Sequence, residues 1–155
     1  MIIWIILIVF LLYNPVSVRI MTVFTALVNN IDSGIFYNLV ATESSFNSFA
    51  VSRNEVFGLG QVKPSTAKYI FRYYVPGMLW IPPLNLHIAA LYYNYLLKRF
   101  GNNHSLSLAA YNWGETNVEN KLRQENISIE TDKNYRELFR NVPETYHYIG
   151  ATIKE

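Results

Sequence analysis

Apolar residues recur every three or four positions along much of the chain, the spacing of helices that pack by one face. This pattern predicts two helices between Met21 and Phe46, separated by the polar break Asp32–Gly34, and a longer helix over Leu84–Phe100 that ends at Gly101. No alternation of period two extends beyond a few residues, and no internal repeat is present. The sequence therefore predicts a mainly α-helical fold.

Shorter helices are marked by their end signals. A helix is expected to begin near Pro64, because proline is tolerated in a first helical turn, and the last helix is expected to begin at Pro143 for the same reason. Another apolar helix follows an Asn or Ser cap and ends at Gly114. The polar segment Lys121–Lys133 lacks periodicity and is predicted to be a surface loop.

The N-terminal stretch differs from the rest, since Ile2–Tyr13 is an unbroken apolar run that ends at Asn14-Pro15. Extended to Val18 it reaches ~27 Å as a helix, slightly short of a hydrocarbon core of about 30 Å. No small-residue cleavage site follows the run, which argues for retention at the membrane, although a cleaved signal and a buried core helix are alternatives. We expect residues 1–18 to be a signal or anchor segment of an exported protein, at the outer face of the cytoplasmic membrane or in the periplasm, and residues 19–155 to form one domain.

Composition excludes several kinds of site. The 155-residue chain has no cysteine, so disulfides, thiolate metal sites and a cysteine nucleophile are excluded. Its net charge is +2 and its basic residues are scattered, so a nucleic-acid partner is not expected. His87, His104 and His147 are far apart in sequence, and no metal or other cofactor is predicted.

One carboxylate has an unusual position. Glu43 follows Leu39 and Val40 by four and three residues, so on a helix it shares a side with apolar groups that face the core. An apolar pocket disfavours the charged form of a carboxyl group and can raise the pKa of a glutamic acid to about 6, as a general acid near neutral pH requires. A solvent-exposed Glu at a helix end is the alternative interpretation.

A glycine-bracketed turn follows the acid. Gly58 and Gly60 permit positive φ or a close backbone approach, and Gln61 offers both a hydrogen-bond donor and an acceptor. Alone, two glycines two positions apart are also common in ordinary turns.

Five segments in this order resemble the motif set of soluble lytic transglycosylase domains, over residues 39 to about 153. They are "ESSF", "GLGQVKPSTA", "LNLHIAALYYNYLLKRFG", "SLAAYNWG" and "PETYHYI". The resemblance implies a lysozyme-like fold of the α+β superfamily, mostly helical, with a cleft for a glycan strand of peptidoglycan.

The resemblance also implies site residues. Glu43 matches the single catalytic acid, and Ser44 matches the serine that helps to position it. The implied substrate-binding residues are Ser44, Gly58, Gln61, Tyr111, Asn112, Trp113 and Glu144. Departures from the family pattern occur at Leu59-Gly60, at "WGETNV" and at Ile81-Pro82-Pro83, and they bear on the preference for particular sugars.

Glycosidases usually need a second carboxylate, and none is well placed along the sequence. Asp32 precedes Glu43 by more than two helical turns, and Glu55 lies in the loop between motifs. The remaining candidates lie in polar stretches, where a surface role is expected: Glu115, Glu119 and Asp132. The resemblance implies a one-acid mechanism that forms 1,6-anhydro-muramyl ends. The alternatives are a hydrolytic muramidase of the same fold and a catalytically silent peptidoglycan-binding secretion-assembly component.

Overall fold

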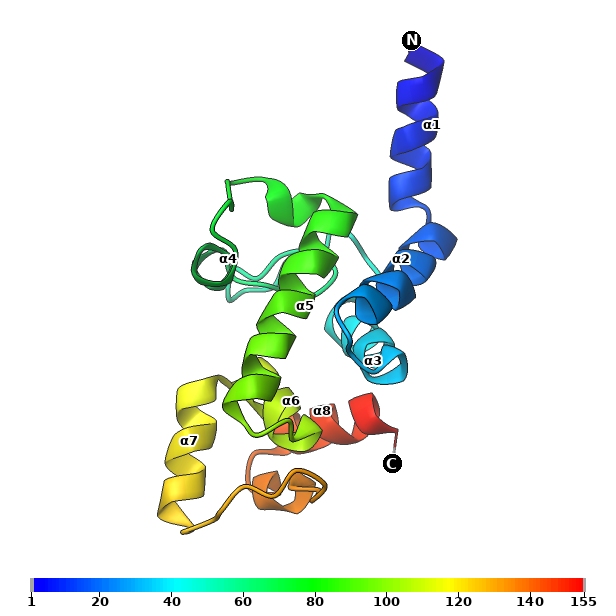
Figure 1. Ribbon diagram of the computed structural model, residues 1–155. Helices are drawn as coiled ribbons and strands as arrows, with labels where there is room; N and C mark the ends of the chain where they lie inside the picture. The colour runs from blue at the N-terminus through cyan, green and yellow to red at the C-terminus, as the bar shows by residue number, and fades with distance from the viewer. Residues whose placement is uncertain (1, 155) are drawn as a thin grey trace. The chain divides into compact units, whose positions relative to one another are not determined.

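The computed structural model describes residues 2–154, which form two compact units, one up to Tyr92 and one from Tyr93 (Figure 1). The first unit contains α1 (Ile2–Tyr13), α2 (Pro15–Val28), α3 (Ser33–Ser44), α4 (Pro64–Ile70) and the 3-10 turn η1 (Met78–Trp80). The second contains α6 (His104–Trp113), α7 (Glu115–Gln124), the 3-10 turn η2 (Arg136–Phe139) and α8 (Pro143–Ile153). Helix α5 (Pro82–Arg99) includes the boundary between them.

The predicted helical class is confirmed. Between residues 2 and 154 the structure has no β-strand, only isolated antiparallel bridges that Phe57 makes with Val51 and Val62. The predicted break between the first two periodic helices is also observed, because α2 ends at Val28 and Asp32 caps α3 by accepting a hydrogen bond from the Ile35 amide at 2.8 Å.

Each unit has its own buried side chains. In the first unit α2 and α3 pack side by side, and α3 buries Phe36, Leu39 and Val40. In the second unit α6 packs against both α7 and α8. The fully buried large side chains of this unit are Tyr93, Leu96, Phe100, Leu106, Leu108, Phe139 and Ile149.

The prediction of a loop over Lys121–Lys133 is wrong at its start. Residues 121–124 belong to α7, which buries only Val118 and Leu122. Two apolar residues four positions apart give too little periodicity to identify a helix, while the ion pair between Lys121 and Glu125, 3.1 Å apart, supports its last turn. The remainder, 125–133, lies outside any helix.

The apolar N-terminal run forms α1, and the predicted boundary at residue 18 lies within α2. No single helix of residues 2–154 is both long and apolar enough to cross a membrane. The pair α1 and α2, bent by 65° at Asn14, satisfies the length and composition requirement together.

Candidate active site

Glu43 lies in the last turn of α3, at a position where the backbone turns sharply. Its side chain is half-buried, as the spacing predicts, and the negative end of the helix dipole gives no stabilisation to a carboxylate there. Ser45 and Phe46 follow with φ of 52° and 63°, the left-handed region that costs a non-glycine residue about 1–3 kcal/mol. Backbone strain of this kind immediately after the candidate acid is typical of functional sites.

Side chains compensate for this strain by holding Phe46. The Tyr37 ring lies 4.7 Å from the Phe46 ring, and the Arg19 guanidinium lies over the Phe46 ring, 4.9 Å from its centroid. Ser44, predicted to position the acid, donates its hydroxyl hydrogen bond to the Val40 carbonyl at 3.2 Å. The end of α3 is therefore a fixed corner, and the role of Ser44 toward the acid stays a prediction.

The glycine-bracketed turn is organised by Asn85, a residue outside the predicted site. Asn85 is 1% exposed, and its side-chain oxygen accepts a hydrogen bond from the Gly60 amide at 2.8 Å. Its side-chain nitrogen donates to the carbonyls of Phe57 and Leu79 at 2.8 and 2.9 Å. One buried amide on α5 thus makes hydrogen bonds to three backbone groups and connects the turn to Leu79 of η1.

Gly58 is required at its position for two separate reasons. Its φ is +72°, and a Cβ atom there would overlap the Asn85 side chain and lie 2.5 Å from the Leu79 carbonyl oxygen. The predicted positive φ at this glycine is therefore observed, whereas Gly60 is not among the residues with positive φ.

Gln61 connects the turn to the segment after the acid. The Gln61 side-chain nitrogen donates to the carbonyls of Gly58 and Ala50 at 2.8 and 3.1 Å, and the Gly58 amide donates to the same Ala50 carbonyl at 2.9 Å. Gln61 itself has φ of 46°. Ala50 lies seven positions after Glu43, so a short hydrogen-bonded segment follows the acid into the turn.

In the second unit, Asn112 and Glu144 come together although 32 positions separate them. Thr145 donates to the Asn112 side-chain oxygen at 2.8 Å, and the Asn112 nitrogen donates to a Glu144 carboxylate oxygen at 3.5 Å. Thr145, which is buried, was not selected from the sequence. Glu144 is exposed in the first turn of α8, where the helix dipole favours a negative charge.

The two aromatic candidates are both half-buried. The Tyr111 ring packs edge-on against the buried Tyr93 ring with centroids 6.4 Å apart. Trp113 makes a similar contact with Phe139, at 6.3 Å. Trp113 therefore has one side in the core, which limits the surface it can offer to a ligand.

The other carboxylates considered as a second catalytic acid form ion pairs, cap a helix or are exposed to solvent. Arg99 forms an ion pair with Glu119 at 2.7 Å and a longer one with Glu115 at 3.9 Å, and the hydrogen bond to Glu119 raises the pKa of Arg99. Asp32 caps α3, and Glu55 and Asp132 are exposed. Among residues 2–154 no three His, Asp or Glu side chains gather as metal ligands.

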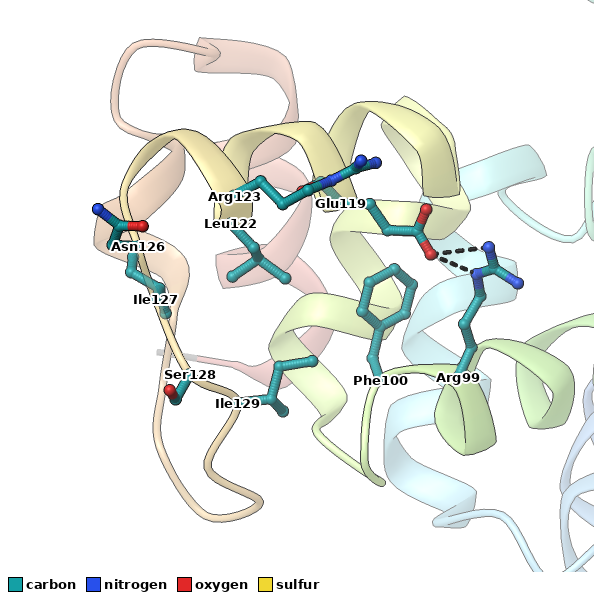
Figure 2. Close-up of a pocket in the computed structure, with 9 residues that line it drawn as sticks. All are labelled: Arg99, Phe100, Glu119, Leu122, Arg123, Asn126, Ile127, Ser128 and Ile129. Atoms are coloured by element: carbon teal, nitrogen blue, oxygen red, sulfur yellow. Dashed lines mark hydrogen bonds and ion pairs between the residues drawn. The ribbon is translucent and has the colours of Figure 1, made fainter.

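A shallow pocket of about 540 Å³ lies in the second unit, but no predicted site residue lines it (Figure 2). Its wall is formed by Arg99, Phe100, Glu119, Leu122, Arg123, Asn126, Ile127, Ser128 and Ile129. Figure 2 shows Arg99 and Glu119 joined by their ion pair at its edge, so both charges are already neutralised.

The signal that could have identified Asn85 is its environment. It is an amide between Leu84 and Leu86 in a helix whose neighbouring turns are apolar, and a buried amide needs hydrogen-bond partners. The partners themselves could not be inferred, because the Gly60 amide lies 25 positions away.

The fold and motifs can be compared with known proteins. The soluble lytic murein transglycosylases of Escherichia coli and Salmonella typhimurium are 37% and 35% identical to this chain over 82 residues. This match covers 49% of the chain and 13% of each relative, so the chain corresponds to a small part of those proteins.

Solved structures of lytic transglycosylases have the same fold. An inactive glutamate-to-glutamine mutant of Slt from Pseudomonas aeruginosa superimposes with a TM-score of 0.74 at 26% identity, covering 87% of this chain and 22% of that one. The 70-kDa soluble lytic transglycosylase in complex with bulgecin A gives a TM-score of 0.76 at 26% identity, covering 90% and 23%. The predicted lysozyme-like fold is thereby confirmed. Because the family model named Transglycosylase SLT domain matches residues 23–134, most of its length, this chain belongs to the SLT transglycosylase domain family.

Proposed function

We propose that the protein is a peptidoglycan lytic transglycosylase. It cleaves the β-1,4 bond between N-acetylmuramic acid and N-acetylglucosamine and leaves a 1,6-anhydro-muramyl end. Membership of the family and the names of the relatives, which act on murein, support this substrate. The observation that carries the proposal is the position of Glu43, half-buried at a strained helix end and followed by a segment tied to the Gly58–Gln61 turn.

Glu43 serves as acid and then as base. The protonated carboxyl group gives its proton to the glycosidic oxygen as the bond from that oxygen to the anomeric carbon breaks, and the substrate's 2-acetamido oxygen stabilises the positive charge. The carboxylate then takes the proton of the 6-hydroxyl while the 6-oxygen bonds to the anomeric carbon. Glu43 ends protonated, as it began. The reaction therefore consumes no water and needs no second carboxylate.

The remaining candidates bind and orient the glycan. We assign this role to Ser44, Gly58, Gln61, Tyr111, Asn112, Trp113 and Glu144. The solved glutamate-to-glutamine mutant of the Pseudomonas relative, which is inactive, supports the dependence on one glutamate.

The same proposal places the enzyme outside the cytoplasm, where peptidoglycan lies. The apolar α1 holds it at the outer face of the cytoplasmic membrane. N-terminal sequencing after cell fractionation would refute retention if mature protein beginning near Arg19 were found in the soluble periplasm.

A substitution at Glu43 tests the assignment of the acid. Glu43→Gln keeps the shape of the side chain and removes its transferable proton, so cleavage of sacculi should fall by about 10²–10⁴-fold while glycan binding and the far-UV spectrum are kept. Glu55→Gln is the matched control, because Glu55 is an exposed loop carboxylate of the same unit, and it should leave the rate unchanged. A Glu43→Gln rate above a tenth of wild type would refute the assignment.

A further inference from the structure

Helix α2 carries an apolar face that the protein leaves exposed. Ile20, Phe24 and Leu27 are 64%, 64% and 61% exposed. The full stripe recurs at helical spacing and consists of Val16, Ile20, Val23, Phe24 and Leu27. The opposite, buried face contains Val18, Thr22, Thr25 and Ala26. The outer face is thus more apolar than the inner one, the reverse of an ordinary surface helix.

This face continues into α1, whose residues from Ile2 to Leu11 are all exposed. The sole charged residue of the two helices is Arg19, and its guanidinium lies over the Phe46 ring. Together α1 and α2 expose an apolar surface far larger than the scattered single residues of a typical soluble domain.

Hydrogen bonds hold the bend at the junction of α1 and α2. The Asn14 side chain accepts a hydrogen bond from the Val16 amide at 2.9 Å, the Asn14 amide donates to the Phe10 carbonyl, and the Val18 amide donates to the Asn14 carbonyl. Pro15 has no amide hydrogen to satisfy. These backbone groups at the bend therefore have hydrogen-bond partners within the chain and need no water when the bend contacts lipid.

The bend is also fixed to the first unit. The Tyr13 hydroxyl donates to the Trp80 carbonyl at 2.9 Å, and the Tyr13 ring stacks on the Phe49 ring at 5.1 Å. The end of α1 is thus held in place relative to α2 and to the residues that pack around it.

The lengths and the bend suit one leaflet of a bilayer. With 12 residues, α1 is about 18 Å long, enough for one leaflet but not for a hydrocarbon core of about 30 Å. If α2 lies in the membrane plane, the 65° bend allows α1 to lie as close as 90° − 65° = 25° to the membrane normal, which is an ordinary tilt.

We propose that α1 and α2 form a single membrane-docking unit, in which α1 enters one leaflet and the outer face of α2 lies flat in the interface. The occupant of the α2 face is the lipid bilayer, because that face is continuous with α1 and has no charged residue along its centre. This proposal rests on the location assigned above but adds a contact made by the folded domain itself. The first unit is consequently held against the membrane by two contacts, the inserted α1 and the outer face of α2, and not by α1 alone.

Single labels can test this geometry, because the chain has no cysteine. Full-length Ile20→Cys, Leu27→Cys and Val75→Cys proteins carry an environment-sensitive fluorophore and are mixed with vesicles of phosphatidylethanolamine and phosphatidylglycerol containing spin-labelled lipids. Val75 is the control, since it is 54% exposed and lies outside α2. Labels at 20 and 27 should shift to the blue and be quenched at the same depth, about 5–10 Å below the headgroups, while the label at 75 stays unchanged.

Each other outcome overturns the proposal. Different depths at 20 and 27 would mean that α2 crosses the bilayer. A blue shift that needs no vesicles and grows with protein concentration would mean that a second copy covers the face. Absence of a shift at both positions would mean that the face stays in water.

Charge substitutions give an independent measurement. The double variant Ile20→Glu/Leu27→Glu should lower partitioning into the same vesicles at least about tenfold, because two apolar side chains lose their burial. Val75→Glu/Ile129→Glu adds the same charge at exposed sites elsewhere and should partition like wild type. Without vesicles, with the protein kept in solution by detergent, both double variants should cleave purified sacculi at the wild-type rate. A failure of membrane docking can therefore be distinguished from a failure of the proposed catalysis.

Discussion

Two asparagines, one in each compact unit, show how similar structural devices can serve different purposes. Asn85 and Asn103 are both 1% exposed, and both bond mainly to backbone groups. The Asn103 side-chain nitrogen lies 2.7 to 3.1 Å from the carbonyls of Glu130, Thr131 and Lys133, and its oxygen caps α6 at the Leu106 amide.

The difference lies in what each amide holds. The hydrogen bonds of Asn85 end on the turn that presents Gly58 and Gln61, which are candidate glycan-binding residues. Those of Asn103 end on a polar loop and a helix start that carry no candidate residue. The two should therefore contribute similarly to stability and differently to activity, a distinction that burial alone does not reveal.

The largest effect is expected from Gly58→Ala. The new methyl group meets the Asn85 side chain and the Leu79 carbonyl, and the alanine must adopt a positive φ. Steric overlap and backbone strain together should lower the free energy of unfolding by roughly 4 kcal/mol, measured by urea denaturation.

Gly77→Ala separates these two causes. Gly77 has φ of +95°, but nothing lies within 4 Å of the place that the new methyl group would take, so only backbone strain of about 1–2 kcal/mol is expected. Equal losses for the two variants would show that Asn85 does not enclose the turn closely.

Substituting the two asparagines tests directly whether they contribute similarly to stability and differently to activity. Asn85→Ala and Asn103→Ala should each lower the free energy of unfolding by about 3 kcal/mol, because each substitution removes several hydrogen bonds from a buried amide to backbone groups. At a temperature where both variants are folded, Asn85→Ala should also turn over sacculi more slowly, whereas Asn103→Ala should keep the wild-type rate. Equal rates per folded molecule would remove the turn from the functional site.

A smaller effect is expected from the tyrosine hydroxyls of the second unit. Tyr111→Phe should lower turnover about tenfold by removing one hydrogen bond to the reacting glycan, with little change in unfolding free energy. Tyr146→Phe is the control, because it removes a hydroxyl that donates to Glu137 at 3.0 Å on an exposed surface. A loss of stability with full activity in Tyr111→Phe would identify Tyr111 as a core residue only.

Much of the fold was predictable because its signals are local. The break at Asp32, the cap before α6 and Pro143 at the start of α8 all act within one helical turn, and all are observed. Helix α7 was missed because only two of its residues are buried, so its stability depends on packing against α6, which no local pattern records.

The candidate site was predictable only in part. Periodicity indicates that Glu43 is half-buried, but its selection as the acid depends on the ordered motifs. The family match covers residues 23–134 and confirms the family, while the role of Glu43 stays a prediction. The contacts from Asn85 to the turn and from Thr145 to Asn112 join residues that are 25 to 33 positions apart. Such pairs follow from tertiary packing and leave no mark in local spacing.

The central claim, that Glu43 alone acts as acid and then base, is tested most directly by the mass of the products. Full-length protein is incubated with purified sacculi, and the released muropeptides are analysed by mass spectrometry. We expect anhydro-muropeptides, each lighter by one water than the hydrolysis product, from wild type, and about 10²–10⁴-fold slower release of them from Glu43→Gln. Reducing muropeptides from wild type would instead identify a hydrolytic muramidase, and no release would identify a binding component; either result would contradict the proposed mechanism.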